Sequence, residues 1–208
     1  MRKSKKIRQP KRAVFSFVVD GKCEFWYLQL LQRYEKVTIN LEPKLPQKKL
    51  LSVQFAQVEE LAEESEKVFW IVDFDTILKE TQEAKRGRKT PLQEFQKLYN
   101  KVGENEKIII IVNNPCLEYW FLLHFEQTSK HFPTYEELEK SVKKHLTDYE
   151  KTERYYKNSR QNIYQRLKPY LPTAITNAEN LGEFTFDNIR TGMTEMRKIF
   201  NSLGIGSR

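Results

Sequence analysis

The sequence predicts an α/β fold built on a mostly parallel sheet with helices on both faces, followed by a helical C-terminal extension. Between residues 13 and 126, short apolar runs alternate four times with longer amphipathic stretches, the pattern of successive strand–helix units. The runs at 68–72 and 108–112 contain no polar residue, as expected of central strands covered on both faces. After residue 126 the strand signals end, so residues 127–208 are predicted to form the helical extension.

Hydrophobic spacing places three strands and two helices before residue 76. Phe25, Leu28 and Leu31 recur at helical intervals, as do the apolar residues between Leu51 and Ala62. The predicted strands are residues 13–19, 37–41 and 68–72, and the predicted helices are residues 24–34 and 48–65.

The segment between the third and fourth strands contains one clear helix signal. Residues 76–89 are polar and are interpreted as an exposed loop or a loosely held helix. Thr90 is then followed by Pro91 and Gln93, which is the pattern of a capping box with proline at the first helical position. A helix is therefore predicted from this point to residue 102.

Capping signals also place the later helices. After the fourth strand, Asn114 and Pro115 predict a helix that runs to residue 125, because asparagine caps and proline opens helices. Thr134 with Glu137 predicts the next helix. Further helical segments are predicted at residues 148–158, 159–170, 172–181 and 188–203.

The chain has 208 residues, with 36 Lys and Arg against 28 Asp and Glu and a formal charge of +8. Seven of the basic residues lie within residues 1–12, where there is no acid, which leaves 29 against 28 elsewhere. Residues 1–12 are therefore predicted to be a basic flexible tail, and a histone-like or ribosomal surface is excluded. The rest is predicted to divide into an α/β core at 13–126 and the extension at 127–208.

Three classes of protein are disfavoured: membrane-spanning, secreted and zinc-stabilised proteins. No apolar run approaches the roughly 20 residues that cross a bilayer, and the run after the tail stops at Asp20 without a cleavage site for a secretory signal. A cytoplasmic protein is therefore predicted. Cys23 and Cys116 form no CxxC pair and the three histidines lack zinc-ligand spacing, so structural zinc is not expected.

Acidic residues follow three of the predicted strands. Asp20 and Glu24 come after the first strand, Asp73 and Asp75 after the third, and Glu118 one turn into the helix after the fourth. Side chains after parallel strands converge at one edge of the sheet, where ligands bind. Asp73 and Asp75 are two apart, so a strand end would point both to one side. Such a group of carboxylates predicts a Mg²⁺ or Mn²⁺ site.

A basic cluster comes soon after the Asp73-Phe74-Asp75 triplet. It consists of Lys85, Arg86, Arg88 and Lys89, and Lys22 adds a cation beside the first acids. Lysine and arginine next to a metal site can hold the phosphates of nucleic acid. The predicted partner is therefore DNA or RNA, although an ordinary exposed loop explains the same charges equally well.

Several other polar residues near the fourth strand have simpler interpretations. His124 is expected to be a core or hydrogen-bonded residue, since it lies off the helical face of Glu118. Cys116 at a helix start is expected to be structural, because no neighbouring base is placed by the sequence. Capping alone explains Asn113 and Asn114.

Three segments carry a resemblance to a known family. Asp20-Gly21-Lys22-Cys23-Glu24, then WIVDFD at 70–75, then IVNNPCLEYWFLLHFE at 111–126 resemble the RloB family. These are bacterial proteins often encoded near restriction or phage-defence genes, usually beside an AAA-type ATPase called RloA. The resemblance runs from about residue 12 to residue 200, and NPCLEYWFLLHF is its most specific part.

The resemblance implies a Toprim-like fold, the metal-binding α/β domain of topoisomerases, primases and OLD-family nucleases. Toprim domains place an acid after the first strand, here Asp20 or Glu24, and a DxD after the third, here Asp73 and Asp75; Glu118 matches the family's N-P-C-x-E. The first motif departs from the family, which more often reads C-E-G-x-x-T-E where this chain has V-D-G-K-C-E. Aspartate in place of glutamate is shorter by a methylene, which would weaken or shift a metal site.

The leading hypothesis is a divalent-metal-dependent nuclease of the RloB type, in a phage-defence system with an AAA-type ATPase partner. The alternative is a non-catalytic subunit that binds nucleic acid or the ATPase with a degenerate Toprim site, which the altered first motif favours. A nucleotide-binding sensor is a weaker hypothesis, since neither GxGxxG nor GxxxxGK[ST] is present.

Overall fold

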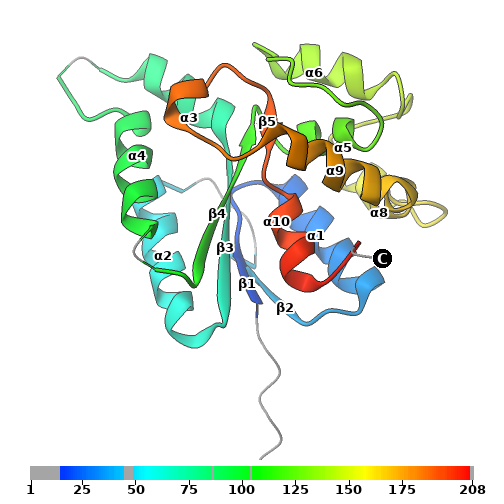
Figure 1. Ribbon diagram of the computed structural model, residues 1–208, viewed down its shortest axis with the longest axis horizontal. Coiled ribbons are helices and arrows are strands. Elements are labelled where there is room, and N and C mark those ends of the chain that lie inside the picture. The colour runs from blue at the N-terminus through cyan, green and yellow to red at the C-terminus, as the bar shows by residue number, and fades with distance from the viewer. Residues whose placement is uncertain (1–14, 45–48, 86, 104, 207–208) are drawn as a thin grey trace, which may run out of the picture.

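A five-stranded sheet forms the centre of the computed structural model, with helices on both of its faces (Figure 1). The strand order is β2-β1-β3-β4-β5, in which the first four strands are parallel and β5 runs antiparallel to β4. The structure describes residues 15–44, 49–85, 87–103 and 105–206. The predicted α/β class, the mostly parallel sheet and the C-terminal helices are confirmed, whereas the predicted tail at 1–12 lies outside the described residues.

The elements follow in chain order. The strands are β1 (Phe15–Val18), β2 (Ile39–Glu42), β3 (Lys67–Asp73), β4 (Ile108–Asn114) and β5 (Met193–Thr194). The α-helices are α1 (Lys22–Glu35), α2 (Leu51–Glu64), α3 (Phe74–Glu83), α4 (Pro91–Val102), α5 (Glu118–Leu123), α6 (Tyr135–Val142), α7 (Glu153–Tyr156), α8 (Ile163–Leu167), α9 (Leu171–Leu181) and α10 (Arg197–Leu203). Two 3₁₀ turns are η1 (Lys168–Tyr170) and η2 (Phe186–Asn188).

The strands bury both faces, and each face has its own hydrophobic core. Alternate residues of β3 divide between them: Phe69 and Ile71 join the core beneath α1 and α5, while Val68 and Trp70 join the core beneath α2 and α4. This division follows from the two-residue period of a strand. It also explains why the central strands read as unbroken apolar runs in the sequence.

Local sequence signals place α4 as predicted. The Thr90 side chain accepts a hydrogen bond from the Gln93 backbone, and the Gln93 side chain accepts one from the Thr90 backbone. Pro91 occupies the first turn, where a backbone N–H would have no acceptor within the helix, so the lack of an N–H in proline removes no hydrogen bond. The capping box therefore marks the start of this helix from local sequence, and the Thr81 hydroxyl of α3 accepts a further hydrogen bond from the Leu92 backbone N–H in the same turn.

The fifth strand corrects the prediction of one helix over residues 188–203. Met193 and Thr194 pair with Asn114 and Asn113 of β4, and helix begins only with α10. The apolar residues of this stretch do have helical spacing, but the free edge of β4 needs hydrogen-bond partners. A strand of two residues is too short to show a period of its own.

Two helix starts also differ from the predictions. Helix α3 begins at Phe74, inside the acidic triplet, and runs to Glu83, so of the two alternatives for residues 76–89, a loop or a loosely held helix, the helix is present over 76–83. Asn114 does not cap a helix, because it still belongs to β4 and α5 begins only at Glu118. Its side chain instead donates hydrogen bonds to the carbonyl oxygens of Ile189 and Thr191, which tie the β4 end to the C-terminal part of the chain.

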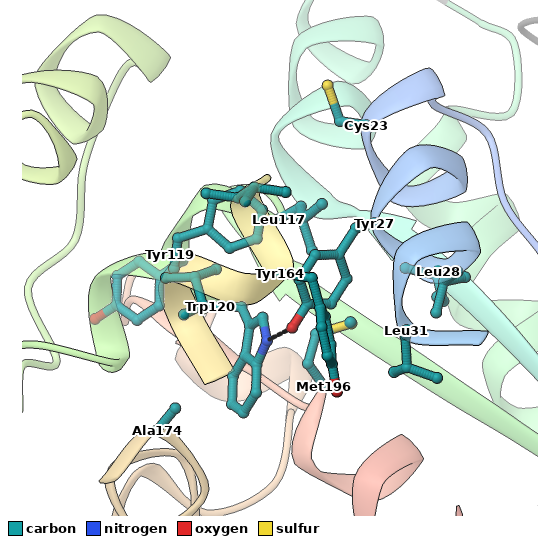
Figure 2. Packing of buried hydrophobic residues seen from close by; sticks show 14 of the residues in the cluster. Cys23, Tyr27, Leu28, Leu31, Leu117, Tyr119, Trp120, Tyr164, Ala174 and Met196 are labelled. Atoms are coloured by element: carbon teal, nitrogen blue, oxygen red, sulfur yellow. Dashed lines mark hydrogen bonds between the residues drawn. The ribbon is translucent and has the colours of Figure 1, made fainter. Parts of the chain in front are cut away.

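The core beneath α1 and α5 is shared with the C-terminal third of the chain. Figure 2 shows Trp120 of α5 donating a hydrogen bond to the hydroxyl of Tyr27 on α1, with an Nε1 to O distance of 2.9 Å. Met196 and Tyr164, from the chain after residue 126, lie beside this pair, and all four side chains are buried. A paired indole N–H and phenol hydroxyl avoid the cost of burying an unsatisfied polar group. The start of α1 is thereby held against α5.

Within the part of the chain that the structure describes, no helix is both long and apolar enough to cross a membrane. The cytoplasmic location stays a prediction.

Candidate metal centre

Four carboxyl groups meet at the carboxyl-terminal edge of the parallel strands and are called the acid cluster below. Glu24 lies in the first turn of α1, Asp73 ends β3, Asp75 lies in the first turn of α3 and Glu118 begins α5. Each of the four influences the charge state of at least one other. The convergence predicted from the strand order is therefore what the fold produces at these positions.

Asp73 and Asp75 do not point to one side as a strand end would place them. Asp73 is the last residue of β3, whereas Asp75 is already helical and its side chain accepts a hydrogen bond from the Thr76 backbone. The Asp75 backbone N–H donates to the Pro115 carbonyl oxygen at 3.1 Å. The two acids thus approach the sheet edge from a strand and from a helix start, with Asp75 tied to the segment that leads into α5.

Burial and mutual repulsion disfavour negative charge in the acid cluster. Loss of solvation, followed by the charge of Glu118, raises the pKa of Glu24 from 4.5 to about 7. The same loss of solvation, together with Glu24, Asp75 and Glu118, raises the pKa of Asp73 well above its ordinary value. Burial also raises the pKa of Asp75. The charge of Glu24 raises the pKa of Asp73, so near neutral pH this pair retains a proton that a cation would displace.

The Glu24 carboxyl folds back over Gly21, the residue that precedes α1. A Cβ atom at position 21 would overlap the Oε2 atom of Glu24. The backbone of Gly21 is extended, which any residue can adopt, so the reason for glycine at this position is the room that it leaves for the Glu24 carboxyl group. Gly21 of the first motif therefore allows Glu24 to reach the acid cluster.

Glu118 is completely buried and is held by residues that the sequence analysis did not select. Tyr149 donates a hydrogen bond to its Oε1 atom at 2.7 Å, and the Tyr149 hydroxyl lies 2.9 Å from that of Tyr156. The Lys151 ammonium lies 3.1 Å from Oε1 and 3.3 Å from Oε2. Burial opposes the charge of Lys151, but Glu118 and the other acidic groups around it together outweigh burial, so the pKa of Lys151 is raised above the ordinary lysine value. Lys151 is thus a permanent cation beside the acids.

A row of cross-strand neighbours holds Asp73. The strand register places Asp73 beside Asn113 and Asn113 beside Thr194. The Asn113 amide donates to Asp73 Oδ1 at 3.1 Å, and the Thr194 hydroxyl donates to Asn113 Oδ1 at 2.6 Å. Asn113 therefore does not cap a helix but positions an acid. Its place at the end of β4, level with Asp73, is the signal from which sequence reasoning could have found it.

Asp20 lies on the side of the acid cluster that faces α2. Its Oδ1 atom accepts a hydrogen bond from the Lys49 backbone at 3.4 Å. Together with Glu24 and Asp73 it lines a small cavity of about 90 Å³, and with Asp73 and Thr76 it lines a second of about 30 Å³. The structure therefore places Asp20 next to the cluster but anchored towards α2.

The basic residues separate into two groups. Lys22 is exposed at the start of α1, two residues from Glu24. Lys85, Arg88 and Lys89 are exposed beyond the far end of α3 (Figure 1), a helix whose ten residues span about 15 Å. Arg86 lies outside the described residues. The basic loop is therefore a helix length away from the acids and not on their immediate rim.

The remaining candidates near β4 are buried. Cys23 and Cys116 are free buried thiols; burial raises the pKa of Cys23 to about 12 and that of Cys116 well above its ordinary value. His124 is buried, with Nδ1 at 2.8 Å from the Trp120 carbonyl oxygen, and burial lowers its pKa to about 4. Both cysteines therefore stay protonated. The expected core position of His124 is confirmed.

A divalent ion fits the chemistry of the acid cluster. Within the described residues, no group of three or more Asp, Glu, His or Cys side chains lies in an arrangement that could hold a metal ion as it stands. The donors are nonetheless all carboxylate oxygens, which Mg²⁺ and Mn²⁺ prefer, and burial together with neighbouring carboxylates raises the pKa values of Glu24 and Asp73. Glu24, Asp73 and Asp75, with Asp20 beside them, would have to shift their carboxyl groups to hold such an ion.

A larger pocket of about 650 Å³ opens beside Asp75. Residues of α3, including Lys79 and Gln82, form one wall, and the segment 131–136 forms the other. Tyr135 in this segment connects the pocket to the acid cluster, because the Lys151 ammonium lies 4.5 Å from the centre of its ring. The acids therefore border a space large enough for a small ligand.

Comparison with known proteins gives one relationship. No curated protein and no solved structure matches the chain. A family model described as RloB-like protein matches residues 15–203, which include every strand and helix of the fold. The chain therefore belongs to the RloB-like family.

Proposed function

We propose that this protein is a divalent-metal-dependent nuclease that hydrolyses phosphodiester bonds. The observation that carries the proposal is the convergence of Glu24, Asp73, Asp75 and Glu118 from the ends of three neighbouring strands. Burial and nearby carboxylates raise the pKa values of Glu24, Asp73 and Asp75. Titratable groups perturbed in this way are more frequent at functional sites than elsewhere. The oxygen-only ligand set favours Mg²⁺ or Mn²⁺ over zinc.

The side chains have distinct roles in this proposal. Asp73 and Asp75 hold the ion, Glu24 or Asp20 is a further ligand or the general base, and Glu118 is a supporting ligand. A bound ion would supply polarisation of a phosphoryl oxygen and a more acidic water. Asn113 fixes the Asp73 carboxylate through the hydrogen bond at 3.1 Å.

The nucleic acid is held by cations of the chain in this proposal. The exposed Lys22 beside the first acids contacts a substrate phosphate. The basic loop of Lys85, Arg86, Arg88 and Lys89 contacts the strand further along, since it begins about one helix length from the acids. These contacts position the backbone and carry no base specificity.

The defence role and the ATPase partner belong to the same proposal. Membership of the RloB-like family supports them. The proposed setting is a phage-defence system in which an AAA-type ATPase acts with this chain.

A nuclease assay with a matched pair of variants tests the proposal. Single-stranded and duplex DNA and RNA are incubated with the purified chain and Mg²⁺ or Mn²⁺, with and without the neighbouring ATPase. Asp73→Asn should abolish cleavage, whereas Asp187→Asn, the same substitution at an exposed position in η2, should leave it intact. Cleavage that survives Asp73→Asn unchanged would remove the assignment.

One observation favours the alternative of a non-catalytic subunit. Lys151 already neutralises Glu118, and the Glu24–Asp73 pair can retain a proton, so the cluster can reduce its own charge without a metal ion. Titration with Mn²⁺, followed by its paramagnetic effect on water relaxation, distinguishes the two functions. The non-catalytic subunit is selected if no Mn²⁺ binding depends on Asp73 while the protein still binds nucleic acid or the ATPase.

A further inference from the structure

The pocket of about 650 Å³ beside the acid cluster has a composition suited to a flat, partly polar ligand. Phe132, Pro133 and Tyr135 supply apolar and aromatic surface, while Gln82 supplies an amide group. Its volume lies within the range of about 300–1,000 Å³ that is typical of small-ligand sites. A nucleobase has the matching chemistry, because its faces stack on aromatic rings and its edge forms hydrogen bonds.

Two residues connect this pocket directly to the acid cluster. Asp75 is a member of the cluster and also lines the pocket. Tyr135 lines the pocket from the other wall, with the Lys151 ammonium 4.5 Å from its ring centre, and Lys151 in turn pairs with Glu118. A ligand in the pocket therefore lies against Asp75 on one wall and against Tyr135, the neighbour of Lys151, on the other.

The lining of the pocket carries charges of both signs. Lys79 extends from α3 on one side and supplies its ammonium group. Asp75 and Glu136 are the acidic groups on the same lining. The Lys79 ammonium can contact a phosphate of a bound nucleotide, while the uncharged aromatic and amide side chains suit its neutral base.

We propose that this pocket receives one unpaired nucleotide of a nucleic-acid substrate, with Tyr135 as a contact to its base. The inference rests on the proposed nuclease function and adds a substrate class to it: single-stranded or locally unpaired nucleic acid. A base inside a duplex is stacked and paired, so it enters a pocket only if it is flipped out, at a cost in unstacking that an unpaired base does not incur.

Binding without cleavage provides the test. Fluorescein-labelled single-stranded oligonucleotides and the blunt duplexes of the same sequence are titrated with the full chain in EDTA and in Ca²⁺, and anisotropy gives each Kd. The single strand should bind more tightly than the duplex. Loss of one base-stacking contact in Tyr135→Ala should weaken single-strand binding by about 5- to 150-fold, while Tyr135→Phe should retain the wild-type Kd.

A second variant separates the pocket from the Tyr135–Lys151 contact. Gln82→Trp fills the pocket from the exposed face of α3 and should weaken single-strand binding without touching the acid cluster. Gln96→Trp places the same side chain at an exposed position of α4 outside the pocket lining, and should bind as the wild type does. Circular dichroism and thermal unfolding establish that all variants are folded.

The outcomes distinguish this inference from the proposed function. If Asp73→Asn abolishes cleavage but Tyr135→Ala and Gln82→Trp bind single strands normally, the pocket assignment is wrong and the nuclease assignment stands. If the pocket variants lose binding but no metal or partner yields cleavage, the nucleotide site stands and the nuclease assignment is wrong. Equal affinity for duplex and single strand, or no binding of either, overturns the inference.

Discussion

Glu24→Gln should make the folded protein more stable at alkaline pH. The folded Glu24 carboxyl binds its proton more tightly than the same group in the unfolded chain, since its pKa rises from 4.5 to about 7. The stabilisation is therefore fully present below about 4.5 and is lost as pH rises through about 7. One pKa unit corresponds to about 1.4 kcal/mol, so the loss amounts to about 3 kcal/mol. Glu24 is only 5% exposed, so solvent screens little of this effect.

Urea unfolding with a chelator present measures the difference. The wild type should lose about 3 kcal/mol more stability than Glu24→Gln between about pH 4.5 and about pH 8. Glu60→Gln on α2, where the glutamate is exposed, controls for the removal of one negative charge at the surface. The free energy of unfolding of Glu60→Gln should change with pH in the same way as that of the wild type.

If the free energy of unfolding falls equally with pH in the wild type and in Glu24→Gln, the reasoning is refuted. The pKa of Glu24 would then be the same in the folded and the unfolded chain. Mg²⁺ adds a second measurement at about pH 8. An ion that binds only the folded state stabilises it, so Mg²⁺ should raise the stability of the wild type and should have a much smaller effect on Glu24→Gln.

Three further substitutions test how the acid cluster is built. Gly21→Ala should displace the Glu24 carboxyl and reduce Mn²⁺ affinity and cleavage, while the melting temperature changes little, because Glu24 is a flexible side chain. Thr194→Val leaves the Asn113 carbonyl oxygen without its hydroxyl donor; about 1–3 kcal/mol of stability should be lost in urea unfolding, together with cleavage activity. Lys151→Met removes the ammonium group from the acid cluster. Because the Lys151 side chain is 41% exposed, the free energy of unfolding should fall by only about 1–2 kcal/mol. Calorimetry should show that Mg²⁺ stabilises this variant more than it stabilises the wild type.

Features of the fold that depend on short stretches of sequence were predictable. The capping box of Thr90, Pro91 and Gln93 placed the start of α4, because all of its partners lie within four residues. The apolar runs of β3 and β4 likewise identified buried strands. The general rule that ligands bind at the carboxyl ends of parallel strands then selected Glu24, Asp73 and Glu118.

Features that depend on tertiary contacts were not predictable. Strand β5 has two residues and exists because β4 offers a free edge. The polar composition of α3, on which only Phe74 and Ile77 are buried, left a loop and a helix as alternatives and did not reveal that the helix begins inside the acidic triplet. Tyr149 and Lys151 lie more than thirty positions from Glu118 in the chain, so no spacing rule connects them to it.

The C-terminal part of the chain determines how the acids can act. Both carboxylate oxygens of Glu118 are occupied: Tyr149 and Lys151 share Oε1, and Lys151 also contacts Oε2. Glu118 can therefore accept a metal ion only if the Lys151 ammonium moves away, whereas Glu24 and Asp73 need only release a proton. A divalent ion should consequently bind first to Glu24, Asp73 and Asp75, with Glu118 as a later or weaker ligand. Because Lys151 is partly exposed, a substrate phosphate can draw it away from Glu118, which would couple metal binding at that carboxylate to the arrival of nucleic acid.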